Sequence, residues 1–465
     1  MINKFDAIII GFGKGGKTLA VDLANRGQKV ALIEKSEKMY GGTCINQACI
    51  PTKVLENQSS LIRRENLDSF NKKEIKYQES IDKKEDLIRK LRNANYNKLN
   101  SNKNINIFTG KGSFINEKTI KIETIHGETI TIEGEKIFIN TGSKPNIPNI
   151  VGLEKSNIVY NNETLMQLKK LPKKLTIIGS GYIGLEFAGI YASFGTEVTV
   201  VNSHSTILER EDVEDSDEVV NILKKRNINF LNDIKLVEIK EENNLAKLVY
   251  IKNGEDKQLE LNSDIILVAT GRKANTEDLD LENANVELDK RGFIKVNEIL
   301  ETSTKNIWAL GDINGGPQFT YISLDDYRIV INQLFGDKSR KITNRTNVPS
   351  ALFLDPAFSR VGLNVKEAQE KGYNILVAKM KTQDIPRAKQ IGKTDGFIKI
   401  VIDKDSEKIL GATMICEESS ELIHLIQLAI DMKVKYTYLR DRIYAHPTMT
   451  EALNDVLSPS MIKEI

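Results

Sequence analysis

An apolar strand that runs into a glycine-rich turn occurs twice in this chain, and no other feature restricts the possible folds as strongly. In the first copy, residues 7–10 lead into Gly11-Phe12-Gly13-Lys14-Gly15-Gly16, whose GxGxxG pattern is formed by Gly11, Gly13 and Gly16. The sequence predicts a helix through about Asn25 and a strand over residues 29–33 that ends at Glu34, 18 residues after Gly16. This arrangement is typical of a Rossmann unit, in which the helix N-terminus binds a pyrophosphate and the acid binds a ribose.

The second copy begins with a strand over residues 175–178 and continues into Gly179-Ser180-Gly181-Tyr182-Ile183-Gly184. A helix follows through residue 193, and a strand over residues 197–201 ends at Asn202, again 18 residues after the third glycine. The chain is therefore expected to be an α/β protein with two dinucleotide sites, as needed if a nicotinamide passes hydride to a flavin. The alternative is a duplicated fold in which one site no longer binds.

Two of the three cysteines lie directly after the first unit. Cys44 and Cys49 are separated by four residues. A pair this close can close a small disulfide ring, and a helix predicted to begin at Pro51 would direct its positive dipole end at both thiols, which favours thiolate. We expect a redox-active disulfide beside a cofactor. The alternative is two small side chains buried in a loop.

The composition argues against several other classes of protein. Lys plus Arg number 66 and Asp plus Glu 64, so no bulk charge attracts nucleic acid or an anionic membrane. No apolar stretch approaches the roughly 20 residues that span a bilayer. Residues 1–6 enter a strand without a signal-peptide pattern. We therefore expect a cytoplasmic protein whose close cysteine pair serves catalysis or metal binding rather than a structural disulfide framework.

The remaining segments give coarser predictions. Residues 54–100 are rich in Lys, Glu and Asn and are expected to form a pair of mostly exposed helices. Residues 105–140 alternate between apolar and polar positions, with a turn at His126-Gly127, and predict a β-meander. Two Thr-Gly turns, Thr141-Gly142 and Thr270-Gly271, are the best candidates for domain seams.

Two later motifs make the chain resemble a known family. Trp308-Ala309-Leu310-Gly311-Asp312 and Tyr444-Ala445-His446-Pro447-Thr448-Met449-Thr450-Glu451 follow the cysteine pair in the order found in the flavoprotein disulfide reductases, the class I pyridine nucleotide-disulfide oxidoreductases. Glutathione reductase, dihydrolipoamide dehydrogenase and mercuric reductase belong to this family. The resemblance covers essentially the whole chain.

The resemblance implies a fold with two Rossmann-like dinucleotide-binding domains and a C-terminal α+β dimerisation domain. An FAD-binding domain would occupy residues 1–142 and 272–342. An NAD(P)-binding domain would occupy residues 143–271, and an interface domain residues 343–465. FAD and NADPH or NADH are the implied cofactors, and no metal is implied.

The resemblance also implies roles for individual residues. Cys49 would face the flavin as the charge-transfer thiol, and Cys44 would be the interchange thiol that meets the substrate. Lys53 and Glu186 would form an ion pair near the flavin, and Tyr182 would be the nicotinamide gate. Asp312 would bind the flavin's ribityl chain. The other implied cofactor-binding residues are Gly42, Thr43, Thr141, Gly142, Ile183 and Gly271.

His446, oriented by Glu451, would reach Cys44 from the partner subunit as its acid–base, so the implied active unit is a homodimer. An imidazole suits this role because its ordinary pKa lets it exchange a proton at cellular pH. The other histidines have plainer expected positions: His126 in a turn, His204 in a surface loop and His424 in an interface core. None of these three histidines has the spacing to other potential ligands that a metal site requires. Cys416 is expected to be a small buried side chain.

The tail at residues 446–455, with residues 324–329 and 359–362, looks most like the RclA-type branch, bacterial flavoproteins associated with oxidant defence. The chain ends at Ile465 without a cysteine pair, which sets aside large thioredoxin reductases and mercuric reductase. The family usually has Gly where this chain has Ala48. The resemblance implies a small oxidant as acceptor, most simply hypothiocyanous acid.

Two alternatives to this function stay open: a dihydrolipoamide dehydrogenase or other small-disulfide reductase, and a non-catalytic redox sensor. The sequence does not choose between acceptors, Cu²⁺ included. It also does not choose between NADH and NADPH. Asn202 does not repel a 2′-phosphate as an acid would, and His204 is the only nearby candidate cation.

Overall fold

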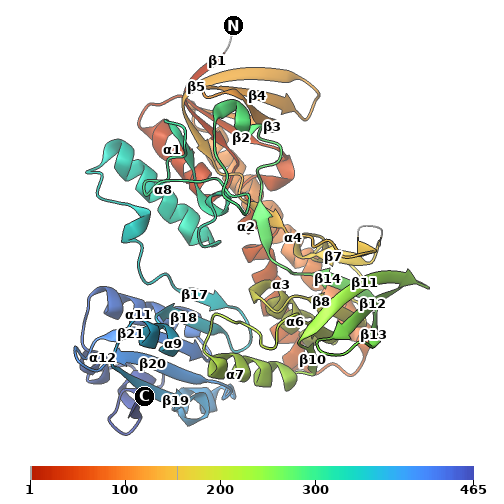
Figure 1. The fold of residues 1–465 in the computed structure, drawn as a ribbon, viewed down its shortest axis with the longest axis vertical. Coiled ribbons are helices and arrows are strands. Elements are labelled where there is room, and N and C mark those ends of the chain that lie inside the picture. The colour runs from red at the N-terminus through yellow and green to blue at the C-terminus, as the bar shows by residue number, and fades with distance from the viewer. Residues whose placement is uncertain (1–2, 154–155) are drawn as a thin grey trace.

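The computed structural model describes residues 3–153 and 156–465, and its elements gather into three bodies (Figure 1). The N-terminal sheet lies in the upper body. Two lower bodies stand side by side, one built around the second glycine-rich turn and one from the C-terminal segment. The expected strand at the N-terminus begins at Asn3, and Met1 and Ile2 lie outside the described residues.

The upper body, here called the first Rossmann unit, contains a sheet in which β3, β2, β1, β5 and β16 run parallel in that order. β4 joins β3 to β5 as an antiparallel meander, as residues 105–140 predict. The strands are β1 (Asn3–Ile10), β2 (Val30–Glu34), β3 (Ile105–Asn116), β4 (Thr119–Thr124), β5 (Thr129–Ile139) and β16 (Ile307–Ala309). Helices α1 (Lys14–Asn25) and α8 (Thr320–Phe335) pack side by side in this unit.

Strand β1 is apolar on both faces because it separates two hydrophobic cores. Ala7 and Ile9 pack in the core that contains residues of α1 and α8, while Ile8 and Ile10 pack in the core formed with the meander. A strand covered on both sides is the reason that residues 7–10 show no alternation.

The second Rossmann unit repeats this plan. Its parallel sheet has the order β10-β9-β8-β14-β7, and a three-stranded antiparallel meander follows it. The sheet strands are β7 (Val159–Asn161), β8 (Lys174–Ile178), β9 (Glu197–Val201), β10 (Ile228–Leu231) and β14 (Ile265–Val268), and the meander strands are β11 (Ile234–Glu242), β12 (Leu245–Lys252) and β13 (Gln258–Ser263). Its helices are α5 (Asn162–Leu165), α6 (Tyr182–Phe194) and α7 (Val213–Lys224). The chain enters and leaves this unit through the antiparallel pair β6 (Ser143–Pro145) and β15 (Arg272–Ala274).

The C-terminal unit is an antiparallel sheet in the order β17-β18-β21-β20-β19-β22, with helices packed against it. Its strands are β17 (Ser350–Leu352), β18 (Phe358–Gly362), β19 (Ile375–Lys381), β20 (Phe397–Asp403), β21 (Ile409–Ile415) and β22 (Ile462–Glu464). Its helices are α9 (Val365–Glu370), α10 (Pro386–Gln390), α11 (Ser419–Asp431), α12 (Tyr436–Arg440) and α13 (Ala452–Val456). Together with the two Rossmann units it gives the expected α/β architecture with a C-terminal α+β part.

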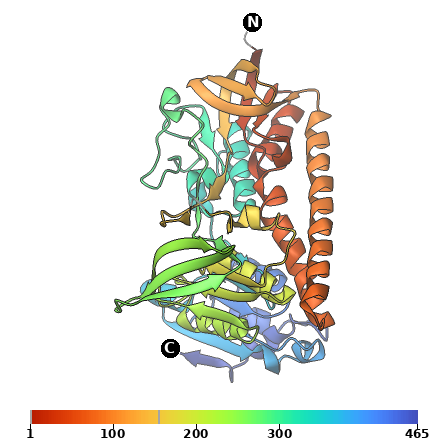
Figure 2. The same ribbon diagram turned by 90° about the vertical axis from the view of Figure 1, so that its right-hand side faces the viewer.

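The cysteine segment carries α2 (Thr43–Asn46) and α3 (Cys49–Glu65), and α4 (Phe70–Asn100) follows. Figure 2 shows α4 running along the side of the molecule, from the first Rossmann unit to the lower bodies. The prediction that a helix begins at Pro51 was wrong by two residues, since α3 begins at Cys49. Proline is tolerated in a first turn because the N–H groups there have no intrahelical partner.

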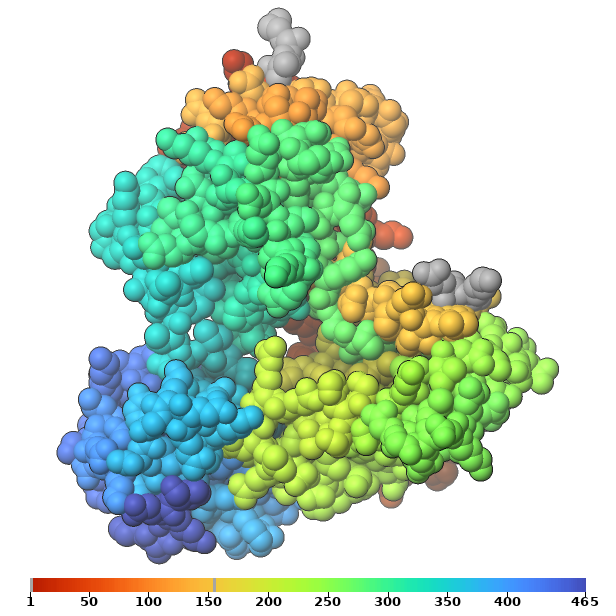
Figure 3. Space-filling model, in the orientation of Figure 1, coloured from red at the N-terminus to blue at the C-terminus, as the bar shows by residue number. Residues whose placement is uncertain are grey.

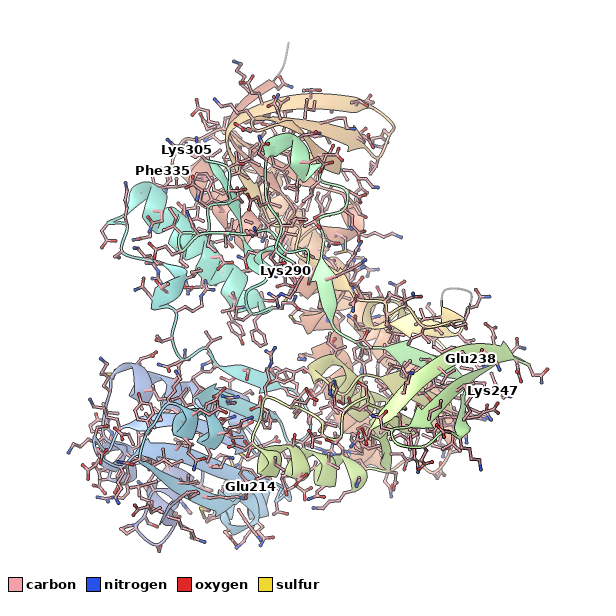
Figure 4. The ribbon with its side chains drawn as sticks, viewed as in Figure 1. Glu214, Glu238, Lys247, Lys290, Lys305 and Phe335 are labelled. Carbon is pink, nitrogen blue, oxygen red and sulfur yellow. The ribbon has the colours of Figure 1, made fainter. Side chains whose placement is uncertain are left out.

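A buried cluster of charges joins the second Rossmann unit to the C-terminal unit. Lys399 of β20 is 1% exposed. Its ammonium lies 2.7 Å from an Asp212 carboxylate oxygen and 2.5 Å from one of Asp215. Lys379 pairs with Glu214, which Figure 4 labels on α7 where the two units meet. These pairs fix the N-terminus of α7 against the sheet of the C-terminal unit.

The structure confirms the predicted strand and helix ends around both glycine-rich turns to within one residue, except that β1 begins at Asn3, four residues before the predicted start. β2 ends at Glu34, β9 covers residues 197–201, and α6 ends at Phe194. In the described ranges, no helix is both long enough and apolar enough to cross a bilayer. The short 3-10 helices are η1 (Glu37–Met39), η3 (Leu281–Ala284), η4 (Gly311–Asn314), η5 (Ile342–Asn344) and η6 (Thr382–Asp384).

Candidate active site

The first glycine-rich turn is held against the neighbouring strand by one side chain. Gly11 has φ +104, and a Cβ there would lie 2.4 Å from the carbonyl oxygen of Asn140. The Asn140 side-chain oxygen accepts from the Gly16 N–H at 2.9 Å, and its amide donates to the Leu310 carbonyl at 2.6 Å. The N–H of Gly15 donates to the Ser323 hydroxyl at 3.0 Å. The turn is therefore rigid, and the N-terminus of α1 opens toward the cavity described below.

Glu34 ends β2 with its side chain beside this turn. Its carboxylate accepts from the Phe12 N–H at 3.1 Å and from the Ser36 N–H at 3.3 Å. It is 7% exposed, and burial raises its pKa to about 7. Hydroxyl donors of a ribose would stabilise its charged form.

The second glycine-rich turn has the same geometry. Gly179 has φ +110, and a Cβ there would lie 2.5 Å from the carbonyl oxygen of Ala269. Asn202 is buried at the end of β9, and its amide donates to the carbonyls of His204 (3.0 Å) and Thr206 (2.8 Å). Asn202 therefore shapes the loop that follows it. A small cavity of about 130 Å³ is lined by Gly179 and Asn202.

One large cavity of about 1910 Å³ connects the first turn, the cysteines and the start of α6. Figure 3 shows the hollow between the upper body and the two lower ones. The expected site residues that line it are Gly11, Gly13, Glu34, Gly42, Thr43, Cys44, Cys49, Lys53, Thr141, Gly142, Tyr182, Ile183, Glu186 and Asp312. Gly16, Gly179, Gly181, Gly184, Asn202, Gly271, His446 and Glu451 are not among its lining residues.

The two thiols differ in their surroundings. A hydrogen bond between them raises the pKa of Cys44, with burial adding to the rise, and lowers the pKa of Cys49 to about 6. The Thr320 hydroxyl, 3.5 Å from the Cys49 sulfur, and the positive charge of Lys53 also lower the Cys49 pKa. At neutral pH, Cys49 is therefore the thiolate, and Cys44 holds the proton.

Lys53 and Glu186 meet between α3 and α6. The Lys53 ammonium lies 2.5 Å from Glu186 Oε2 and 4.4 Å from the centre of the Phe353 ring. Glu186 Oε1 accepts from the Phe353 N–H at 3.0 Å. The Lys53 ammonium of this pair lowers the pKa of Cys49, and the Glu186 carboxylate opposes that effect.

His446 lies away from this cavity. Its Nδ1 is 2.8 Å from Glu451 Oε2, and the side chain is 72% exposed. Glu451 Oε1 also accepts from the Thr448 N–H at 3.3 Å, so the carboxylate is held by its own loop. Within one chain, the imidazole and the thiols are not brought together.

Residues beside the two Thr-Gly turns form a small polar network with Asp312 on the cavity wall. The Ser143 hydroxyl donates to Asp312 Oδ2 at 2.7 Å, and Arg272 donates to the same hydroxyl at 2.8 Å. The Thr141 hydroxyl donates to the Asn275 carbonyl at 3.0 Å. Asp312 therefore keeps one carboxylate oxygen, Oδ1, for which no hydrogen bond is recorded within the described part of the chain.

Sequence reasoning missed several residues at the site. Thr320 contacts Cys49 from 271 positions away, and Asn140 and Ser323 hold the first turn from a distance. Only Asn140 carries a local signal, because it directly follows an apolar strand at the edge where parallel strands end.

His126, His204 and the third cysteine are not among the lining residues of the large cavity, whereas His424 is one of them. His204 Nδ1 is 2.7 Å from Glu209 Oε1 in an exposed loop. His424 is exposed on the single chain and contacts Gln427. Cys416 is fully buried directly after β21, and burial raises its pKa to about 12, so its interpretation as a buried small side chain is confirmed. No group of three or more His, Cys, Asp or Glu placed to hold a metal occurs in the described ranges.

Comparison with known proteins identifies two family models in the chain. Residues 5–326 match the pyridine nucleotide-disulphide oxidoreductase model, and residues 348–457 match the dimerisation domain of the same family. The chain is 40% identical to the probable pyridine nucleotide-disulfide oxidoreductase RclA of Escherichia coli, over 98% of this chain and 99% of that protein. It is 32% identical to dihydrolipoyl dehydrogenase of Chlamydia muridarum, over 97% of this chain and 96% of that protein.

Solved structures agree with these matches. The Cu(II) complex of the HOCl-induced flavoprotein disulfide reductase RclA from Escherichia coli superposes with a TM-score of 0.91 at 40% identity, covering 98% of this chain and 99% of that one. A second structure of the HOCl-induced flavoprotein disulfide reductase RclA from Escherichia coli, not named as a copper complex, superposes with a TM-score of 0.90 at 40% identity. It covers 97% of this chain and 98% of that one. The chain therefore belongs to the pyridine nucleotide-disulphide oxidoreductase family, as a flavoprotein disulfide reductase of the RclA type.

Proposed function

We propose that this oxidoreductase takes electrons from NAD(P)H and uses the Cys44–Cys49 pair to reduce a small oxidant, most simply hypothiocyanous acid. The observation that carries the proposal is that Cys44 and Cys49 line one cavity together with the Lys53–Glu186 ion pair, and the opposite directions of the two thiol pKa shifts support it. The similarity to RclA, which is described as HOCl-induced, supports an oxidant as the acceptor.

The residues around the cavity fit the two cofactors of the family. The rigid turn at Gly11 leaves the N-terminus of α1 for a pyrophosphate, and Glu34 stands at the position of a ribose acceptor. Asp312 would hold the ribityl chain, and Lys53 would lie near the reactive end of the flavin. When bound, FAD carries two electrons from NAD(P)H to the Cys44–Cys49 disulfide.

The oxidative half of the reaction can be written with protein side chains alone, taken from both subunits of a homodimer. The Cys44 thiolate attacks the electrophilic sulfur of hypothiocyanous acid, a sulfur–sulfur bond forms, and the oxygen leaves as water with a proton from an acid. The Cys49 thiolate then attacks the Cys44 sulfur and releases thiocyanate, which restores the disulfide. Overall, one NAD(P)H and one hypothiocyanous acid give NAD(P)⁺, thiocyanate and water.

Cys44 needs a base because its thiol holds the proton in the single chain. We propose that His446 of a partner subunit supplies this base in a homodimer, with Glu451 fixing the ring. The exposure of His446 and the match to a dimerisation domain support this arrangement. A dithiol that must cycle between reduced and oxidised states also suits a cytoplasmic location.

The test is a panel of acceptors given to the purified FAD-loaded enzyme, with NAD(P)H oxidation as the readout. Hypothiocyanous acid, lipoamide, glutathione disulfide and Cu²⁺ would be compared at equal concentrations. We expect kcat/KM for hypothiocyanous acid to exceed that for lipoamide by about 100-fold or more. A reversed ratio would identify a dihydrolipoamide dehydrogenase and refute the oxidant.

Two cysteine variants accompany this panel, with Cys44→Ser as the test of the relay and Cys416→Ser as its matched control. Cys44→Ser should abolish acceptor reduction, because it removes the attacking thiol. Cys416→Ser changes a buried cysteine of the C-terminal unit that lies outside the cavity, and it should leave the ranking of acceptors unchanged. Near-normal turnover by Cys44→Ser would mean that the disulfide is not the electron relay.

A further inference from the structure

Tyr182 lies between the second glycine-rich turn and the large cavity. It is the first residue of α6, directly after Gly181 of the second glycine-rich turn, and its side chain lines the large cavity. One turn further along α6, Glu186 contacts Lys53 of the first Rossmann unit. The family resemblance implies that Tyr182 is the nicotinamide gate, so the contacts that hold its side chain bear on how a nucleotide enters the site.

The Tyr182 hydroxyl is tied to the C-terminal unit. It donates to the Ser350 hydroxyl at 3.2 Å, and Ser350 is the first residue of β17. Burial and the neighbouring Glu211 carboxylate raise the pKa of Tyr182, so the hydroxyl stays a neutral donor. The side chain of Tyr182 is therefore held by a residue that belongs to neither Rossmann unit.

Ser350 is itself held firmly. It pairs with Arg360 across the β17–β18 ladder. The Arg360 guanidinium, 13% exposed, donates to Glu211 at 3.0 Å and also pairs with Glu367. Glu211 belongs to the segment that follows Asn202 and is 7% exposed. These contacts thus connect three parts of the molecule, which are strand β17, the segment that follows Asn202 and the Tyr182 ring.

We propose that Ser350 is a positioning residue that latches Tyr182 across the path of the nicotinamide. Binding of NAD(P)H then has to break the Tyr182–Ser350 hydrogen bond, and part of its binding free energy is used for this step. Only molecules in which the Tyr182–Ser350 hydrogen bond is broken can bind the nucleotide, so the observed affinity is reduced to the fraction of such molecules. Since one hydrogen bond contributes modestly, its loss should tighten the apparent Kd by about 2- to 10-fold.

The experiment measures reduction of the FAD-loaded enzyme by NADPH and by NADH in rapid mixing, with no acceptor present. Wild type, Ser350→Ala, Tyr182→Phe and the double variant are compared. The apparent Kd comes from the dependence of the rate of flavin bleaching on nucleotide concentration. Both single variants should lower it by a similar factor, and the double variant should lower it no further, because all three lack the same bond.

Ser350→Thr is the matched control, because it keeps the hydroxyl and should keep the wild-type Kd. An unchanged or weaker Kd in Ser350→Ala, or additive effects in the double variant, would overturn the latch. Should Ser350→Ala fail to fold, Tyr182→Phe and Ser350→Thr alone still decide between a lowered and an unchanged Kd. The test rests on the proposed use of NAD(P)H but not on the acceptor, so failure of hypothiocyanous acid as substrate leaves it intact.

Discussion

Two thiols of identical chemistry acquire different roles because their neighbours differ. Cys49 is the first residue of α3, so its sulfur lies at the positive end of a helix, near the Lys53 ammonium and the Thr320 hydroxyl. Cys44 has the thiol of Cys49 as its main partner and holds the shared proton. In the reduced pair, Cys49 is therefore the thiolate, and Cys44 is a neutral thiol that needs a base before it can attack.

Replacing Thr320 tests the origin of the low Cys49 pKa. The thiolate of Cys49 predominates above pH 6, so its alkylation in the reduced enzyme should rise through about pH 6 and then level off. Thr320→Val removes a hydroxyl that favours the charged form, and the midpoint should move up by about 0.5–1 pH unit. Thr320→Ser should keep the original midpoint. Rates of iodoacetamide labelling of Cys49, followed by peptide mass spectrometry, measure this, and equal midpoints for Val and Ser would contradict it.

We expect the preference between NADH and NADPH to depend on the charge of the loop that follows Asn202. His204 is the candidate contact for a 2′-phosphate, but its Nδ1 is paired with Glu209, whose carboxylate also repels a phosphate. We expect kcat/KM for NADH and NADPH to differ by no more than roughly 30-fold. Glu209→Gln should shift the ratio toward NADPH by about 3- to 10-fold.

His204→Asn combined with Glu209→Gln is the control for this prediction. The added change should cancel most of the gain if the imidazole is the phosphate contact. A gain that survives without His204 would assign the effect to the lost carboxylate alone. A wild-type ratio beyond a thousand in either direction would contradict the prediction of dual use.

Helix α4 connects the thiol segment to the second Rossmann unit. Near its C-terminal end, Arg92 donates to the Asn46 side chain at 2.8 Å, and Asn46 in turn donates to the carbonyls of Tyr40 and Gly42. Near its N-terminal end, Tyr77 donates to the Leu168 carbonyl at 2.7 Å, and near its middle Lys84 donates to the Met166 carbonyl. One helix thus fixes the segment that carries Cys44 relative to the second Rossmann unit.

Removing the Arg92 contact should loosen the Cys44 turn and little else. In Arg92→Met, backbone amides within residues 40–47 should exchange hydrogen about 5- to 10-fold faster, because one charged hydrogen bond no longer opposes local opening. Arg89→Met is the matched control on the same helix, since Arg89 is 68% exposed and, within residues 3–153 and 156–465, pairs only with Asp86. Hydrogen exchange with mass spectrometry measures both. Equal protection of this segment in the two variants would show that Arg92 does not hold it.

Local patterns predict the two Rossmann units well, because each depends on residues close together in the chain. The glycines, the apolar strands and the terminal Glu34 and Asn202 all occur within about one βαβ unit. The start of α3 was missed because a proline in a first turn looks like a boundary and need not be one. Prediction from sequence therefore succeeds where structure follows from short-range geometry.

Contacts between residues far apart in the chain could not be predicted in the same way. Thr320 reaches Cys49, Ser350 reaches Tyr182 across 168 positions, and Lys399 reaches Asp215 across 184. None of these pairs has a local pattern, and each depends on how whole sheets are placed. The cavity is therefore a property of the assembled molecule, and His446 remains outside it within one chain.

The assembled homodimer gives the last prediction, which is that two inactive variants complement each other. Cys44→Ser lacks the attacking thiol, and His446→Ala lacks the acid–base group, which usually costs about 10²- to 10⁴-fold in rate. In a heterodimer of the two, the intact Cys44 of one subunit would face the intact His446 of the other. Differently tagged subunits, coexpressed and purified through both tags, should recover about half of the wild-type activity, because one of two symmetric sites is complete.

A matched heterodimer shows whether this recovery comes from the shared site. Cys44→Ser combined with Cys49→Ser leaves no subunit with both thiols, so it should stay inactive although it also mixes two variants. An imidazole that served its own subunit would leave the first heterodimer without any complete site. Activity no higher than that of the separate variants would then refute the proposal that His446 crosses the interface, whatever the acceptor proves to be.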